Sequence, residues 1–177
     1  VAMPAGVRVA ELRALWPTVI HAQDAGRSPA PLTQGDAVVG YFPSSGTTGT
    51  PKFIGVSHDL FYRRVSRKAL ALPLPRDLRQ ICHIGPGTWY GFSSSIRALW
   101  LGGTIILTEN PAQIVPAIRA HQVNYLVLAP ITLQQAMAGL PADGGPLPSL
   151  PMIAVGGSAL PLPLFELAAR CLCPDIY

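Results

Sequence analysis

The sequence predicts an α/β fold in which crossover helices cover a layered, mostly parallel sheet. Three observations lead to this prediction. Short apolar runs recur from Asp36 onward, segments with helical spacing separate them, and proline, glycine or polar residues mark many boundaries. Continuous apolar strands are typical of parallel sheets that are buried on both faces. Strands that alternate with helices indicate crossover connections.

Five short runs are the predicted strands of this sheet. They are mainly apolar, as expected of strands that are covered on both sides. The predicted strands are 37–42, 81–84, 104–107, 124–128 and 152–155.

Four helices are predicted between or after these strands. Ser57 can cap the first helix, which Pro73 would end. Asn110 followed by Pro111 favours the start of the second helix. The four helices are expected at about 57–72, 110–121, 133–140 and 164–171.

The chain is predicted to hold one α/β unit behind a lead segment. Residues 1–35 form the lead segment, with a short amphipathic helical stretch at 9–16. Residues 36–177 carry the alternating pattern, and 141–148 is a surface loop because the pattern resumes after it. Charged residues make up only 12% of the 177 residues, about half of the usual share. We therefore expect a piece of a larger protein.

The composition argues against several functional classes. Hydrophobic residues at 49% and so few charges do not suit a coiled coil or an acidic disordered tail. The net charge is +4, but the basic residues cluster only at 63–68. We interpret that cluster as cations at the end of a helix, which complement its dipole, and we expect no nucleic-acid partner.

Other signals of location and metal binding are weak. The three cysteines lack C-x-x-C spacing, so neither a disulfide framework nor a zinc site is predicted. His83 is interpreted as a core histidine whose hydrogen bonds are satisfied. No stretch reaches the ~20 apolar residues that a membrane helix needs, and the start lacks a signal peptide. We expect a cytoplasmic protein with no membrane span.

The strongest chemical signal is the run Ser44–Lys52, in the order Ser-Ser-Gly-Thr-Thr-Gly-Thr-Pro-Lys. Its two glycines let the backbone turn successive amides toward one point. The hydroxyls add donors and Lys52 adds a positive charge, so the run can form a pocket for phosphate oxygens. It is not a Walker loop, because G-x-x-x-x-G-K-[ST] does not match. On composition alone, an ordinary turn between two strands remains the alternative.

The order of these residues resembles the nucleotide-binding signature of the adenylate-forming superfamily. That family includes acyl-CoA synthetases, adenylation domains of peptide synthetases and luciferases. The match runs from Tyr41 to His58. The resemblance implies that the loop grips the β- and γ-phosphates of ATP. The residues implied in this role are Ser44, Ser45, Gly46, Thr47, Thr48, Gly49, Thr50 and Lys52.

Two later segments are also similar to the family. Residues 88–92, with the helix and strand that follow, resemble its acyl-pocket helix and next strand. Residues 155–160 resemble the turn that lies against the adenine and the substrate carboxylate. The implied site residues are Trp89, Tyr90, Gly91, Phe92 and Ser93 for the substrate pocket and Gly156, Gly157 and Ser158 for the nucleotide. The aromatic residues of the first group have the alternative of simply packing, while Gly91 and the serines near it are expected to leave room.

Three departures from the family pattern stand out. Phe53 occupies a position where the family commonly has glycine, and Gly87-Thr88 replaces an aromatic-histidine pair. Tyr177 lies where a Tyr-Gly-x-Thr-Glu motif should begin. The glutamate that helps to hold Mg²⁺ and the family's catalytic lysine would both lie beyond it. No catalytic residue is therefore assigned to these 177 residues.

The resemblance implies part of an ATP-dependent acid–thiol ligase that uses ATP and Mg²⁺. Such an enzyme joins a carboxylic acid to AMP and then passes the acyl group to CoA or an acyl carrier protein. The fragment by itself is expected to be inactive. Two alternatives remain open: a non-catalytic phosphate- or nucleotide-binding module with a degenerate adenylation fold, and an unrelated α/β nucleotide binder. A serine hydrolase is not indicated, since no G-x-S-x-G elbow exists.

Overall fold

The computed structural model describes residues 34–44, 52–140, 147 and 150–177, and the predicted α/β class is confirmed. The amphipathic stretch at 9–16 and most of the loop at 141–148 lie outside the described residues. The elements are β1 (Val38–Ser44), β2 (Lys52–Ser57), α2 (His58–Ala71), β3 (Arg79–Cys82), α3 (Trp89–Trp100), β4 (Thr104–Ile105), η1 (Pro111–Gln113), α4 (Ile114–His121), β5 (Tyr125–Leu128), α5 (Pro130–Met137), β6 (Met152–Val155) and α6 (Leu162–Cys171).

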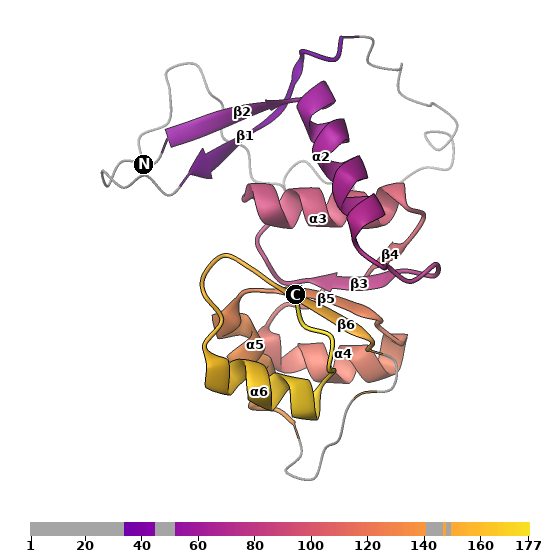
Figure 1. Ribbon diagram of the computed structural model, residues 1–177, viewed down its shortest axis with the longest axis vertical. Coiled ribbons are helices and arrows are strands. Elements are labelled where there is room, and N and C mark those ends of the chain that lie inside the picture. The colour runs from indigo at the N-terminus through magenta and orange to yellow at the C-terminus, as the bar shows by residue number, and fades with distance from the viewer. Residues whose placement is uncertain (1–33, 45–51, 141–146, 148–149) are drawn as a thin grey trace, which may run out of the picture.

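A parallel sheet of four strands forms the centre of the molecule (Figure 1). The strand order is β4-β3-β5-β6, and each neighbouring pair is parallel. The last residues extend the edge beside β6. The Tyr177 N–H donates to the Ile153 carbonyl at 2.9 Å, and the Val155 N–H donates to the Tyr177 carbonyl at 2.8 Å. Parallel neighbours need crossover connections, and α3, α4 and α5 supply them.

Helices cover both faces of this sheet. Helix α3 lies on one face, and α4, α5 and α6 lie on the other (Figure 1). Strand β5 is buried along its whole length, with alternate side chains on opposite faces. Leu126 and Leu128 join the core under α4–α6, whereas Tyr125 and Val127 join the core under α3. The predicted two-sided burial is therefore confirmed for β5.

Strand β1 departs from the prediction. The run 37–42 was expected in the parallel sheet, but β1 pairs antiparallel with β2 in a separate two-stranded sheet. Strand β2 was not among the five predicted strands and entered only through the alternative of a turn between two strands. Within β1 only Phe42 is buried. An antiparallel partner that follows soon in the sequence needs no crossover helix, so this apolar run forms a hairpin instead.

Local helix signals held well. The Ser57 side chain accepts a hydrogen bond from the Leu60 N–H at 3.3 Å, as predicted for an N-cap, and α2 ends before Pro73. Pro111 opens the short η1, and α4 follows directly. Helices α5 and α6 begin at Pro130 and Leu162, slightly earlier than predicted. Proline in the first turn costs no helical hydrogen bond, which explains the earlier starts.

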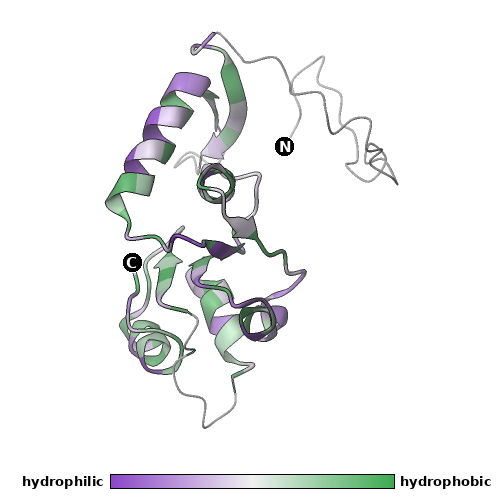
Figure 2. Cartoon of the chain, turned by 90° about the vertical axis from the view of Figure 1, so that its right-hand side faces the viewer, coloured by the Kyte–Doolittle hydropathy of each residue, from purple (hydrophilic) through white to green (hydrophobic). Residues whose placement is uncertain are grey.

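Helix α2 and the β1–β2 hairpin differ in hydropathy (Figure 2). Helix α2 carries many hydrophilic residues, whereas the hairpin exposes Tyr41, Phe53 and Ile54 at 67%, 48% and 55%.

In the part of the chain that the structure describes, no helix has the length and apolarity required to cross a membrane.

Helix α3 approaches the segment after β3 so closely that only glycine fits at position 91. A Cβ atom there would overlap the carbonyl oxygens of Ile84 and Gly85. We predict that Gly91→Ala lowers the free energy of unfolding by about 1–3 kcal/mol, measured by urea denaturation. Gly87→Ala is the control, because a Cβ at Gly87 meets nothing within 4 Å. Equal losses in both variants would contradict this explanation.

Candidate functional site

The two ends of the predicted phosphate loop are held together by the hairpin. Ser44 closes β1, Lys52 opens β2, and the two residues are partners in the strand register. The Ser44 Oγ donates to the Lys52 carbonyl at 3.2 Å. The remaining loop residues, Ser45, Gly46, Thr47, Thr48, Gly49, Thr50 and Pro51, lie outside the described residues. The strands fix where the loop leaves and re-enters the fold.

An aromatic cluster connects the hairpin to α3. Phe42 precedes the loop, and its ring centroid lies 5.4 Å from that of Trp89 and 5.3 Å from that of Phe92. Phe61 of α2 contacts the same two rings at 5.9 and 5.7 Å. The ring of Phe92 thus packs among aromatic neighbours, and the strand that leads into the loop is fixed against the predicted pocket helix.

The first turn of α3 is closed by Thr88. Its hydroxyl accepts a hydrogen bond from the Gly91 N–H at 3.1 Å and donates to the Gly85 carbonyl at 2.9 Å. This N-cap had no counterpart in the sequence prediction, although threonine before an apolar helix is a recognisable signal. Gly91 was expected to leave room for a pocket. Its Cα instead faces the Ile84–Gly85 backbone, so Gly91 allows close packing.

The structure brings the pocket helix beside the glycine turn after β6. A Cβ at Gly156 would lie 2.5 Å from the Tyr90 ring, so this ring packs directly on the turn. The Gly156 N–H donates to the Leu128 carbonyl at 3.0 Å. Gly157 has a φ of 96°, a conformation that favours glycine, and Ser158 is exposed. Two segments that resemble the same family site are therefore in contact through Tyr90.

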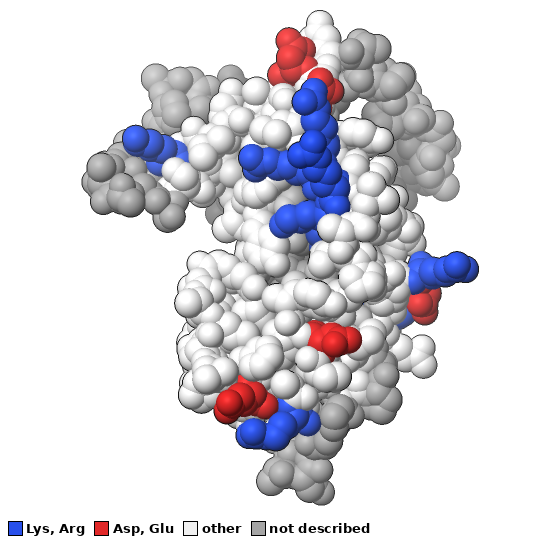
Figure 3. All heavy atoms as spheres, viewed as in Figure 1, with Lys and Arg blue, Asp and Glu red and all other residues white. Residues whose placement is uncertain are grey.

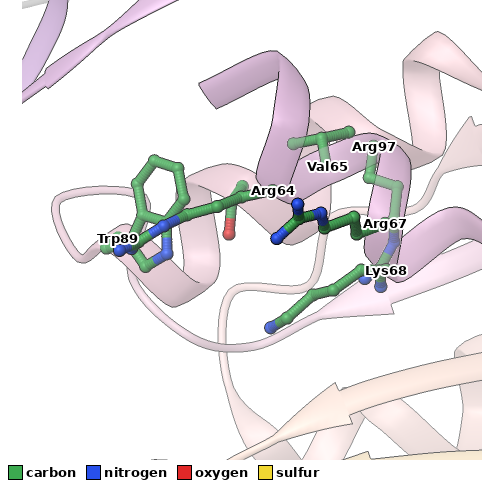
Figure 4. A pocket seen from close by; sticks show the side chains of 7 residues that line it. Arg64, Val65, Arg67, Lys68, Trp89 and Arg97 are labelled. Carbon is green, nitrogen blue, oxygen red and sulfur yellow. The ribbon is translucent and has the colours of Figure 1, made fainter. Parts of the chain in front are cut away.

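A cavity of about 430 Å³ lies between α2 and α3 (Figure 4). Of the five residues predicted for the substrate pocket, Trp89 and Ser93 line it. Tyr90 contacts the glycine turn, while Gly91 and Phe92 pack. The other lining residues are Arg64, Val65, Arg67, Lys68 and Arg97.

The interpretation of the basic cluster on α2 as cations at the end of a helix holds for Lys68 alone. Helix α2 continues to Ala71, so only Lys68 lies in its last turn, where the dipole acts. The Arg64 guanidinium carbon lies 5.5 Å from the Trp89 ring centroid, and the Lys68 Nζ lies 4.9 Å from that of Tyr90. Both cations thus contact aromatic rings of α3.

Arg97 was missed by the sequence analysis. It is 2% exposed, and one terminal nitrogen of its guanidinium donates to the Tyr125 hydroxyl at 3.4 Å. Its Nε has no hydrogen-bond partner among the described residues, and neither do Gln80 Oε1 and Ser94 Oγ. A charged residue inside the apolar run of α3 was the available signal. The predicted satisfied state of His83 is also wrong for its Nε2, which is buried with no described partner.

Burial changes the acidity of the groups around the cavity. It raises the pKa of Tyr90 and of Tyr125, despite the opposing charge of Arg97. It also lowers the pKa of Lys68, with further lowering by Arg97 and then Arg64. The region is thus an environment in which neutral phenols and several cations lie close together.

Comparison with known proteins extends these observations. A family model described as "AMP-binding enzyme" matches residues 5–177. Enterobactin synthase component E of Escherichia coli (strain K12) is 34% identical over an alignment of 148 residues, and the match covers 78% of this chain and 26% of that protein. The chain therefore spans about a quarter of the length of this relative.

Solved structures share the fold. O-succinylbenzoate Coenzyme A synthetase (MenE) from Bacillus subtilis, in complex with ATP and magnesium ion, has a TM-score of 0.66 and 25% identity; the match covers 76% of this chain and 28% of that one. The N-terminal domain of FACL13 from Mycobacterium tuberculosis has a TM-score of 0.69 and 20% identity over 80% of this chain and 36% of that one. The second likeness concerns the fold alone.

The raised pKa of Tyr125 predicts a loss of stability at high pH. The folded state favours the neutral phenol, so this contribution is complete only well below pH ~10, where an unperturbed phenol is half ionised. Above that pH the unfolded state releases the proton first, and stability falls. We expect Tyr125→Phe to make the fall in the urea midpoint between pH 9 and 11 shallower. Parallel pH curves for both proteins would contradict the assignment.

Proposed function

The chain belongs to the AMP-binding enzyme family, and from that membership we propose that it is part of an ATP-dependent enzyme that activates a carboxylic acid. In the proposed reaction the carboxylate attacks the α-phosphorus of ATP. Pyrophosphate leaves and an acyl-adenylate forms. The thiol of CoA or of an acyl carrier protein then displaces AMP and takes the acyl group.

The observation that carries the proposal is the signature run Ser44–Lys52 at the end of a paired hairpin. We propose that its hydroxyls and amides, with Lys52, bind the β- and γ-phosphates and neutralise the leaving pyrophosphate. Catalysis of such transfers rests mainly on positioning and charge stabilisation. The Ser44–Lys52 pairing supports this role, because it fixes both ends of the loop.

The acid and the adenylate are proposed to lie along α3. Trp89 and Ser93 would contact the acyl portion, since both line the cavity. Gly156, Gly157 and Ser158 would contact the nucleotide. Tyr90, which packs on Gly156, would lie between the acyl portion and the nucleotide. Gly91 and Phe92 support this arrangement by packing. We further propose that residues 36–177 are the nucleotide-binding portion and that 1–35 form a lead segment.

Mg²⁺ would balance charge on the ATP phosphates when bound. In the described part of the chain, no group of three His, Cys, Asp or Glu residues could hold a metal ion. The described residues therefore do not form a complete metal site, and the roles proposed for them need no metal ligand among them. They bind and orient the substrates.

Lys52→Ala tests the role of the loop. Loss of one charge-assisted contact should slow ATP–pyrophosphate exchange by the full-length protein by about 10- to 100-fold. Arg119→Ala is a matched control, because Arg119 is an exposed cation on α4, across the sheet from α3. An unchanged exchange rate in Lys52→Ala would contradict the loop's role. Nucleotide binding without exchange for any acid would instead favour a non-catalytic module.

A further inference from the structure

We propose that the cavity between α2 and α3 binds an oxyanion, and that this oxyanion is a second acidic group on the carboxylic acid substrate. The inference rests on the proposed function, because it names the substrate class for the same site. The substrate would then be a diacid. One carboxylate would react beside the glycine turn after β6, and the other acidic group would lie among the cations of α2 and α3.

Positive charge at this cavity has no described counter-charge. Arg64, Arg67, Lys68 and Arg97 line it, and the other lining residues carry no negative charge. In the described segments the one ion pair joins Arg63 and Asp59 at 4.0 Å, with side chains 70% and 64% exposed. Lys and Arg side chains form a column along α2 with acidic atoms only near its upper end (Figure 3).

Arg97 is the strongest indication of a ligand. A charged side chain is almost never fully buried unless it is paired, because removing the charge from water is costly. Arg97 is 2% exposed, and its one described side-chain partner is the Tyr125 hydroxyl. Burial raises the pKa of Tyr125, so that phenol is neutral and cannot balance the charge. Arg97 lines the cavity and its buried Nε has no described partner, and guanidinium groups bind carboxylate and phosphate oxygens well.

The surrounding cations are arranged to share such a ligand. In Figure 4, Arg67 and Lys68 extend from α2 on the side where the Arg97 guanidinium lies, and Arg64 reaches across Trp89. The contacts of Arg64 with Trp89 and of Lys68 with Tyr90 offset part of the cost of grouping the positive charges. These contacts use none of the hydrogen-bond donors of the two cations. Burial lowers the pKa of Lys68, and repulsion by Arg97 and then Arg64 lowers it further. A bound anion would relieve that repulsion.

The position of the cavity favours a group on the acid substrate. A volume of about 430 Å³ lies within the usual range for small-molecule sites. Trp89 and Ser93 line the cavity, and Tyr90, between them in the sequence, packs on Gly156. A short molecule along this part of α3 would thus have one end near the glycine turn and the other among the cations. A phosphate of a nucleotide or of CoA offers the same oxygen chemistry, and the experiment separates the two sources.

The test is ATP–pyrophosphate exchange by the full-length protein with matched acids. Each pair contains a monocarboxylic and a dicarboxylic acid of equal length, in aliphatic and aromatic series. For the diacids that the wild type uses best, we expect kcat/KM to be about 10- to 100-fold higher than for the monocarboxylic acids of equal length. Lys68→Met and Arg97→Met should lower kcat/KM for each diacid more than for its monoacid partner, so that the ratio between the two falls toward one.

Two features keep the test independent of folding effects. Lys68 is solvent-accessible, so Lys68→Met probes the cavity without emptying a buried position as Arg97→Met does. Arg63→Met removes an exposed cation of the same helix that does not line the cavity, and it should keep the preference. Calorimetric titration with inorganic phosphate and with succinate, without nucleotide, measures oxyanion binding directly in the wild type, Lys68→Met and Arg63→Met.

The outcomes are distinct. A diacid preference that both cavity variants lose and Arg63→Met keeps supports the inference. Phosphate binding that Lys68→Met weakens, without any diacid preference, supports the oxyanion site but overturns its assignment to the acid. Equal rates for paired acids, with phosphate and succinate binding absent or unchanged in Lys68→Met, overturn the inference and leave the proposed function intact. If none of the acids supports ATP–pyrophosphate exchange, the proposed function is overturned. The calorimetric titrations with phosphate and succinate then still decide whether the cavity binds an oxyanion.

Discussion

The packing of α3 on the parallel sheet is the contact on which the rest of the site depends. Strand β5 is apolar on both faces, so a helix has to cover each of them. Helix α3 covers one face, and Gly91 and Thr88 set how closely its first turn approaches the segment after β3. Because α3 is fixed there, Tyr90 reaches the turn after β6. The outer surface of α3 packs against α2 and the hairpin.

Features that depend on neighbouring residues were predictable from the sequence. The strands of the parallel sheet, the Ser57 cap and the proline-led helices all follow from local patterns. The hairpin was not recognised, because the pairing of β2 with β1 is not contained in either run of residues alone. Strand β1 was assigned to the wrong sheet for the same reason: an apolar run does not reveal its partner.

The site divides in a similar way. The proposed phosphate loop rests on the order of its residues, and the structure contributes the pairing at its two ends. The contact between Tyr90 and Gly156 joins segments far apart in the chain, so no local pattern contains it. The cationic cavity arises only when α2 lies across α3. From sequence, Arg64 and Lys68 are ordinary helix cations, and the structure alone places them beside Arg97.

The cation–π contacts of Arg64 and Lys68 also bear on how tightly any ligand could be held. Long basic side chains normally lose much rotational freedom when they close on an anion, and this loss weakens binding. Here the faces of Trp89 and Tyr90 already restrict them before a ligand arrives. For Arg64 and Lys68, part of that ordering is therefore completed during folding, so that a ligand closing on these two side chains would lose less affinity to it.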